Sequence, residues 1–277
     1  MTNGGILSFY IISYLDVDPL RFMKKHSTFF IRHSQGGKMA GLAVKVDQVA
    51  VLRGVRKSQF PDPVTAAALA EVAGADGIVV HLRQDRRHIK DRDVRILRSI
   101  VQSKLILEMG STSEMIGVAL DIKPDLVTLV PENRQHSSAE GGLDLIVNRD
   151  DISETVGTLQ NSGIPVGLLV DPELEQIKLA HKCNAAMVEI HTETYCDAKT
   201  AQTRHQALLN IVDAVKLAHK LKLSVRAGRG LCYKTIKAFK GIPEIDEYSI
   251  GHSIVSRAIL SGMRHAVEKM IRLIAAL

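Results

Sequence analysis

The feature that most constrains the fold of this 277-residue chain is a regular alternation of short apolar runs and amphipathic segments from residue 40 onward. Strands that alternate with helices form parallel sheets with right-handed crossovers. Eight such units in about 235 residues predict a closed α/β barrel, the (β/α)₈ or TIM-barrel fold with a parallel eight-stranded core. The predicted strands are Leu42–Val46, Gly77–His81, Lys104–Glu108, Leu126–Val130, Pro165–Val170, Ala186–Ile190, Ser224–Ala227 and Tyr248–Ile250. The predicted helices are Pro63–Ala73, Arg92–Ser103, Ser113–Asp121, Ile152–Ser162, Glu173–His181, Thr200–Lys220, Lys234–Phe239 and Ile254–Ala275.

The alternative fold is an open doubly wound sheet, which more often has five or six such units and a glycine-rich first turn. No GxGxxG motif follows the first predicted strand, so the closed barrel is favoured. Helix-start signals agree with the assigned helices. Asp62 before Pro63 is typical of an N-cap followed by an N1 proline, and Asp171 before Pro172 is interpreted in the same way.

Composition narrows the functional class. Hydrophobic residues make up 45% of the chain but aromatic residues only 4%, so the core must consist mainly of Val, Ile, Leu and Ala, as in strands buried on both faces. The net charge of +6 is spread along the chain without an arginine-rich run interleaved with aromatics, which argues against a nucleic-acid partner. Three widely spaced cysteines indicate a reducing compartment and no structural zinc.

The amino-terminal region, residues 1–38, does not share the alternating pattern. Its apolar stretch Ile6–Leu15 is too short to span a bilayer and lacks the features of a signal peptide, so we expect a cytoplasmic protein without a membrane partner. We predict two parts: an extension over residues 1–38, either disordered or upstream of a true start at Met39, and a single catalytic barrel over residues 39–277.

The candidate site follows from the rule that barrel enzymes place their active sites at the carboxyl ends of the strands. His81, Glu108 and His191 end three different predicted strands. Any one of them alone is more often a packing or ion-pair residue than a catalytic one. Three ionisable groups that end buried strands on one rim instead indicate an active site, and a glutamate with two histidines can move protons at neutral pH.

Basic residues and glycines near the same rim predict phosphorylated ligands. Arg53, Arg56 and Arg83 lie at or beyond strand ends, and Gly228 and Gly251 follow the last two strands, where backbone N–H groups can approach an anion. A metal site is a minority interpretation because no HxH or HExxH spacing occurs. No lysine ends a strand in the second half of the chain, which disfavours a Schiff-base aldolase. We expect no cofactor.

The motifs resemble those of the pyridoxine 5′-phosphate synthase family, from about Met39 to the carboxyl terminus. The segments that carry the resemblance include Phe60–Pro63, Ala73–Gly77, His81–Arg83, Asp85–Ile89, Asp91–Arg95, Leu107–Met109, Val130–Glu132, Glu140–Asp144, Glu189–Thr192 and Ile250–His252. The resemblance implies a metal-free, octameric barrel with transferase-type chemistry. Its reaction condenses 1-deoxy-D-xylulose 5-phosphate with 3-amino-2-oxopropyl phosphate, giving pyridoxine 5′-phosphate, phosphate and water.

The resemblance also implies residue roles. His81 and Glu108 act as proton acceptors and His191 as the proton donor. The residues implied to hold the two phosphorylated substrates are Asp47, Arg83, His88 and Ser138 for the first, and Arg56, Thr192 and Gly228 for the second. Lys45, Gln48, Arg229, Gly251 and His252 complete the predicted substrate-binding set.

Three positions of this chain depart from the family pattern, and all three map to substrate-contacting positions. Lys45 replaces the usual Asn, Gln48 the usual His, and Arg229 the usual His. Three hypotheses therefore remain open: a synthase with a modified pocket, a diverged paralogue acting on another phosphorylated carbonyl compound, and a weakly catalytic phosphometabolite-binding barrel. The retained set of His81, Glu108 and His191 argues against the last.

Overall fold

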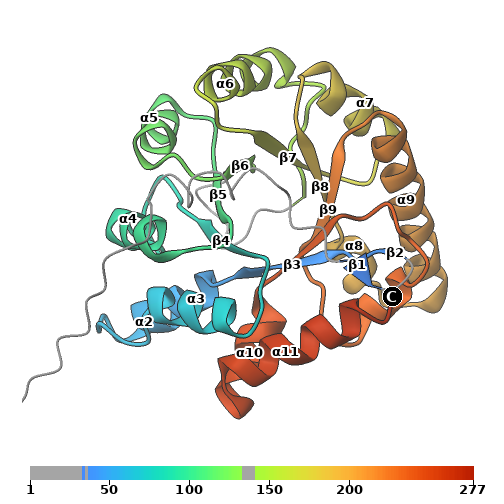
Figure 1. Ribbon diagram of the computed structural model, residues 1–277. Coiled ribbons are helices and arrows are strands. Elements are labelled where there is room, and N and C mark those ends of the chain that lie inside the picture. The colour runs from blue at the N-terminus through green and yellow to red at the C-terminus, as the bar shows by residue number, and fades with distance from the viewer. Residues whose placement is uncertain (1–32, 35–36, 133–140) are drawn as a thin grey trace, which may run out of the picture. The chain divides into compact units, whose positions relative to one another are not determined.

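A computed structural model describes residues 33–34, 37–132 and 141–277, all within the compact unit Arg32–Leu277. Eight parallel strands form a closed barrel in the order β10-β3-β4-β5-β6-β7-β8-β9, with helices around the outside of the ring (Figure 1). The predicted α/β fold, an eight-stranded (β/α)₈ barrel, is therefore confirmed.

The strands lie within one or two residues of their predicted ranges. They are β3 (Gly41–Lys45), β4 (Gly77–His81), β5 (Leu105–Met109), β6 (Leu126–Leu129), β7 (Val166–Val170), β8 (Met187–His191), β9 (Ser224–Gly228) and β10 (Glu247–Ile250). The helices are α2 (Asp47–Val55), α3 (Pro63–Val72), α4 (Asp91–Ile100), α5 (Ser113–Ile122), α6 (Arg149–Asn161), α7 (Leu174–Lys182), α8 (Glu193–Cys196), α9 (Ala201–Lys220), the 3₁₀ helix η1 (Thr235–Phe239), α10 (His252–Ser261) and α11 (Met263–Ile274).

Alternation along each strand divides the core into two layers. Outward residues such as Val44, Val80 and Leu107 pack with the surrounding helices in one large apolar cluster. Inward residues form a separate small apolar cluster, made of Ala43, Val79, Ile106, Leu126 and Met187. The inward positions next along the strands are polar, so the upper half of the barrel interior carries charged side chains rather than a third apolar layer.

The helix predictions need four corrections, the first being the short helix α8, which was not predicted. Helix α2 was missed because it begins directly after β3, and its N-cap residue, Val46, offers no capping side chain. The predicted helix Ile254–Ala275 is wrong as one element: α10 and α11 are separated by Gly262, whose φ of 80° breaks the helix. Asp171 is not an N-cap, since the residue before α7 is Glu173. Asp62, in contrast, accepts a hydrogen bond from the Val64 backbone N–H at 3.0 Å, as expected.

Two further strands, β1 (His33–Ser34) and β2 (Gly37–Lys38), pair antiparallel with each other before the barrel begins. The rest of the predicted extension lies outside the described residues. The prediction that translation starts at Met39 is not tested by the structure. No helix in the described ranges combines the length and apolarity that a bilayer crossing needs.

Candidate active site

Charged side chains fill the axis of the barrel from its amino-terminal face to its mouth. Inward residues of β3, β5, β8, β9 and β10 supply most of them, and four basic side chains alternate with four acidic ones. We call this set the charge column; its ion pairs are Lys104–Glu247 (2.5 Å), Glu247–Arg226 (2.6 Å), Arg226–Glu189 (3.3 Å), Glu189–Arg229 (3.9 Å), Arg229–Glu108 (2.8 Å), Glu108–Lys45 (2.5 Å) and Lys45–Asp47 (3.2 Å).

Glu108 is the member of the column that the sequence predicts to be catalytic. It lies on β5 opposite His81 of β4, and its side chain is fully buried. Lys45 and Arg229 both donate to the same oxygen, Oε2, at 2.5 and 2.8 Å. The other oxygen, Oε1, is also buried but receives no hydrogen bond from the described part of the chain.

The pKa values of the two buried carboxyl groups in the upper column, Glu108 and Glu189, are shifted in opposite directions. Burial alone raises the pKa of Glu108, but the positive charges of Arg229 and Lys45 overcome it and hold that pKa well below its usual range. Burial and the nearby Glu108 carboxylate raise the pKa of Glu189, against the opposing effect of Arg226. Glu108 is therefore the ionised partner in the free protein, and a weak base.

His81 ends β4 and is held from two directions. Its backbone N–H donates to Asp47 Oδ1 at 2.8 Å, and its Nε2 lies 3.6 Å from Glu132 Oε1. Burial raises the pKa of Glu132, but the nearby His81 ring and the backbone N–H groups of Gln84 and Gly110 outweigh it, so the net pKa is lowered. An ionised Glu132 therefore lies beside the imidazole of His81 at the rim.

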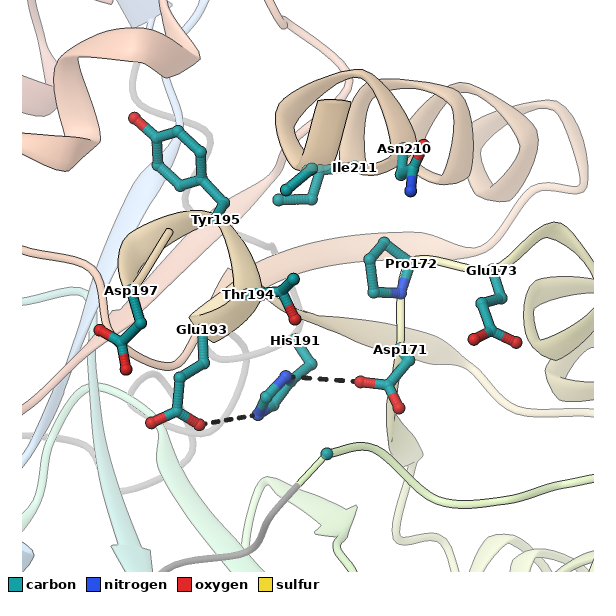
Figure 2. A pocket seen from close by; sticks show the side chains of 12 residues that line it. Asp171, Pro172, Glu173, His191, Glu193, Thr194, Tyr195, Asp197, Asn210 and Ile211 are labelled. Atoms are coloured by element: carbon teal, nitrogen blue, oxygen red, sulfur yellow. Dashed lines mark ion pairs between the residues drawn. The ribbon is translucent and has the colours of Figure 1, made fainter. Parts of the chain in front are cut away.

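His191 ends β8 and lies between two carboxylates (Figure 2). Its Nδ1 is 3.4 Å from Asp171 Oδ1 and its Nε2 is 3.4 Å from Glu193 Oε2. The side chain is 4% exposed, and burial lowers its pKa even though Asp171 acts in the opposite direction. His191 is therefore neutral near pH 7, with two carboxylates placed to stabilise the imidazolium once it gains a proton.

A cavity of about 500 Å³ opens beside His191. Four acidic residues line it, namely Asp171, Glu173, Glu193 and Asp197. The mouth is thus polarised, with carboxylates around β8 and α8 and the basic groups Lys45 and Arg229 on the side of β3 and β9. The acidic side suits a cation and the basic side suits an anion.

Arg83 and His88, both predicted to bind substrate, follow β4. Arg83 is buried, with its Nε 3.5 Å from Asp85 Oδ1. Burial lowers the pKa of His88, partly offset by the nearby Asp47. Asp47 links this region to the column, because its Oδ1 accepts from the His81 backbone while its Oδ2 contacts Lys45.

Gly228 and Gly251 make room for neighbouring side chains and backbone. A Cβ on Gly228 would lie 2.5 Å from Glu189 Oε1, and one on Gly251 would lie 2.8 Å from Gln48 Oε1 and 2.9 Å from the Lys45 carbonyl oxygen. Thr192 donates from its hydroxyl to the Gly228 carbonyl at 2.9 Å. These contacts bring the predicted residues Gln48, Thr192, Gly228 and Gly251 to the same rim.

Three predicted residues are not brought into these contacts. Arg56 is exposed just after α2, and within the described ranges no contact joins it to the rim histidines or Glu108. His252 is exposed on the first turn of α10, 3.4 Å from Ser256 Oγ. Ser138 lies outside the described residues.

Several residues of the site were not singled out as site residues from the sequence. Glu193 and Asp171 flank His191, and Glu132 contacts His81. Arg226 and Glu247 anchor the lower half of the column. Their inward positions could have been found from strand parity, but their pairing depends on strand register, which the sequence does not state. Among the described residues, no group of three or more His, Cys, Asp or Glu side chains is arranged to hold a metal ion.

Comparison with known proteins identifies the family. The family model described as pyridoxal phosphate biosynthesis protein PdxJ matches residues 42–276. The chain belongs to the PdxJ family. Its relatives include a pyridoxine 5′-phosphate synthase of Desulforapulum autotrophicum, 56% identical over 86% of this chain and 100% of the relative, and one of Desulfatibacillum aliphaticivorans, 54% identical over 85% and 98%.

Solved structures agree on the fold of this PdxJ-family chain. A tryptophan synthase from M. tuberculosis has a TM-score of 0.60 at 13% identity, covering 85% of this chain and 93% of that chain. KGPDC from Streptococcus mutans has a TM-score of 0.58 at 13% identity, covering 86% and 98%. At such low identity the likeness supports the barrel and carries no function.

Proposed function

We propose that this chain is a pyridoxine 5′-phosphate synthase in which Glu108 and His81 accept protons and His191 donates one. The observation that carries the proposal is the placement of these three side chains on one rim of a PdxJ-family barrel. The substrates are 1-deoxy-D-xylulose 5-phosphate and 3-amino-2-oxopropyl phosphate, and pyridoxine 5′-phosphate, phosphate and water are the products.

The reaction class fits the chemistry of these groups. Imine formation joins the two substrates with loss of water, phosphate is then eliminated, and carbon–carbon condensation closes the ring. Each step moves protons, and a positioned acid or base typically contributes about 10²–10⁴-fold to such a step. His191 starts neutral between Asp171 and Glu193, so it can take up a proton early in the cycle and return it to a leaving group later.

The polarised mouth gives the substrates an orientation. The amino-ketone substrate carries a phosphate and an amine, and the deoxyxylulose substrate carries a phosphate. We place the phosphates on the side of Arg83, His88 and Arg229, and the protonated amine toward Asp171 and Glu193. The amine must lose its proton before it attacks a carbonyl, and a neutral His191 is positioned to receive it.

The same proposal includes a cytoplasmic location and a homo-oligomer, octameric by family resemblance. A groove of about 600 Å³ lies on the outside of the barrel, where α2, α3 and α10 meet. Its apolar lining is exposed: Leu52 by 41%, Leu69 by 45% and Ile259 by 67%. A second copy of the chain is the occupant we propose, because burying such a surface is favourable.

Complementation tests the proposed function. The chain should restore growth without pyridoxine to an auxotroph that lacks its own synthase, while Glu108→Gln at equal expression should not. Folded, well-expressed wild-type protein that fails to restore growth would overturn the proposal.

The second candidate is a paralogue that uses another phosphorylated carbonyl substrate. The observation in its favour is the altered pocket, where Lys45 and Arg229 contact Glu108 directly. A purified protein that turns over other phosphorylated ketones and fails to form pyridoxine 5′-phosphate would support this candidate over the first.

A further inference from the structure

Lys45 and Arg229 bind one oxygen of Glu108 from two different strands. Lys45 ends β3 and Arg229 follows β9, yet their side chains converge on Oε2 at 2.5 and 2.8 Å. Oε1 stays buried without a hydrogen bond from any described residue. Glu108 is thus restrained through Oε2, and Oε1 is the oxygen left to bind a proton once both cations move away. We call Lys45 and Arg229 the Glu108 clamp.

Both clamp side chains are largely buried but keep a small exposed fraction, whereas Glu108 has none. The exposed fraction is 12% for Lys45, 15% for Arg229 and 0% for Glu108. An anion that enters the mouth therefore meets the clamp before it meets Glu108. Phosphate offers several charged oxygens and competes well with a single carboxylate oxygen for an ammonium or a guanidinium group.

The clamp is also held in place by the protein at a cost. Arg229 has a φ of 75°, in the left-handed region that a side chain with a Cβ rarely adopts. This backbone turn directs the guanidinium into the barrel, where its Nε is 3.9 Å from Glu189 Oε1. Lys45 has a second partner in Asp47 at 3.2 Å. Each cation thus keeps an acidic neighbour if it leaves Glu108.

We propose that the clamp prevents Glu108 from accepting a proton until an anionic group of the substrate draws Lys45 and Arg229 away. The inference rests on the proposed role of Glu108 as a proton acceptor, and it makes both clamp residues positioning residues. In the released state a substrate C–H bond breaks, the proton forms an O–H bond on Glu108, and the electron pair remains on the substrate next to its carbonyl or imine. No redox partner is needed.

The charged groups of the described residues around Glu108 enter this argument. Besides the clamp, they are Asp47 of α2, His81 of β4 with Glu132 beyond it, and Glu189 of β8, which pairs with Arg226 of β9. Glu189 and Asp47 act against the ionised form of Glu108 and His81 supports it when protonated. Removing the clamp therefore leaves a buried carboxylate beside other carboxylates, which favours its protonated form.

The direct test is spectroscopic and needs no turnover. The protonation of Glu108 is followed by infrared difference spectroscopy or by NMR of ¹³C-labelled glutamate, with Glu108→Gln to assign the signal. In the wild-type protein Glu108 should stay ionised down to acid pH. Lys45→Met should raise its titration midpoint by at least about one pH unit. Arg229→Gln provides a second variant in case the first does not fold.

Lys104→Met is the matched control, because Lys104 belongs to the same charge column but pairs with Glu247 at the opposite end. It should leave the titration of Glu108 unchanged. Inorganic phosphate, added as the probe anion to the wild-type protein, should raise the Glu108 midpoint. An unchanged Glu108 midpoint in both clamp variants would overturn the claim that Lys45 and Arg229 keep Glu108 ionised. An unchanged midpoint in wild-type protein with bound phosphate would overturn the claim that a substrate anion releases Glu108.

Kinetics separates this inference from the proposed function. If the clamp opens when substrate binds, the acid limb of the pH profile of kcat lies at higher pH than the acid limb of the pH profile of kcat/KM. Lys45→Met should then move the acid limb for kcat/KM toward that for kcat. Coincident wild-type limbs would contradict the release. A protein that shows the spectroscopic shifts but forms no pyridoxine 5′-phosphate would refute the proposed function and leave the clamp in place.

Discussion

Replacing Arg226 by methionine tests whether the charge column supports the barrel. Arg226 is fully buried and donates to Glu247 Oε2 at 2.6 and 2.8 Å, and to Glu189 Oε2 and Thr128 Oγ1 at 3.3 Å each. Removing one member of a buried ion pair costs about 3–5 kcal/mol, since it leaves a buried charge without compensation. Lys104 remains 2.5 Å from the other oxygen of Glu247, so we expect the lower end, about 3 kcal/mol.

The assay is urea unfolding followed by circular dichroism at one fixed protein concentration, because association changes apparent stability. Two further variants calibrate it. Arg226→Met combined with Glu247→Leu should recover most of the loss, because an apolar pair can replace a buried ion pair at little cost. Lys178→Met removes an exposed ion pair with Glu175 and should cost less than about 1 kcal/mol. A single variant within about 1 kcal/mol of wild type, or a double variant no more stable than the single one, would refute the reasoning.

Three other predictions concern the pocket, the pH dependence and the assembly. Replacing the three departures together (Lys45→Asn, Gln48→His and Arg229→His) should lower kcat/KM about tenfold or more, because charged contacts to phosphate contribute about 1.5–3 kcal/mol each. A higher kcat/KM in steady-state kinetics would instead show that the three residues impair the enzyme. Burial lowers the pKa of His191, so below the ordinary value of 6.5 the unfolded chain takes up a proton before the folded chain does, and stability falls. His191→Gln should therefore weaken the pH dependence of the unfolding free energy between pH 6.5 and 5. An unchanged slope of unfolding free energy against pH would contradict this. Ile259→Glu should yield a smaller species in light scattering, and an unchanged mass would exclude the groove as the subunit contact.

The sequence was sufficient for the fold and for the rim because both follow from local patterns. Buried strands such as Gly77–His81 are short apolar runs between turn signals, and strand ends define the rim of a barrel without any knowledge of register. Helix α2 was not predictable, since Val46 provides no capping side chain. The break at Gly262 was missed because a single glycine within a helical pattern is often tolerated.

The interior charges could be predicted only in part. Lys45 and Arg229 were identified as departures near a phosphate, but their contact with Glu108 depends on the register between β3, β5 and β9. Asp171 was interpreted as an N-cap because Asp-Pro is a common helix start, whereas its carboxylate faces His191. Such contacts join residues 20 to 121 positions apart, and no local pattern encodes them.

The central claim is that this barrel closes the pyridine ring by proton transfers at Glu108 and the two rim histidines. The most direct measurement incubates the purified chain with 1-deoxy-D-xylulose 5-phosphate and 3-amino-2-oxopropyl phosphate, and quantifies pyridoxine 5′-phosphate together with released phosphate. We expect one phosphate released per ring formed, and a rate about 10²–10⁴-fold lower in Glu108→Gln. Folded wild-type protein that forms no pyridoxine 5′-phosphate, or a Glu108→Gln variant as fast as wild type, would contradict the account.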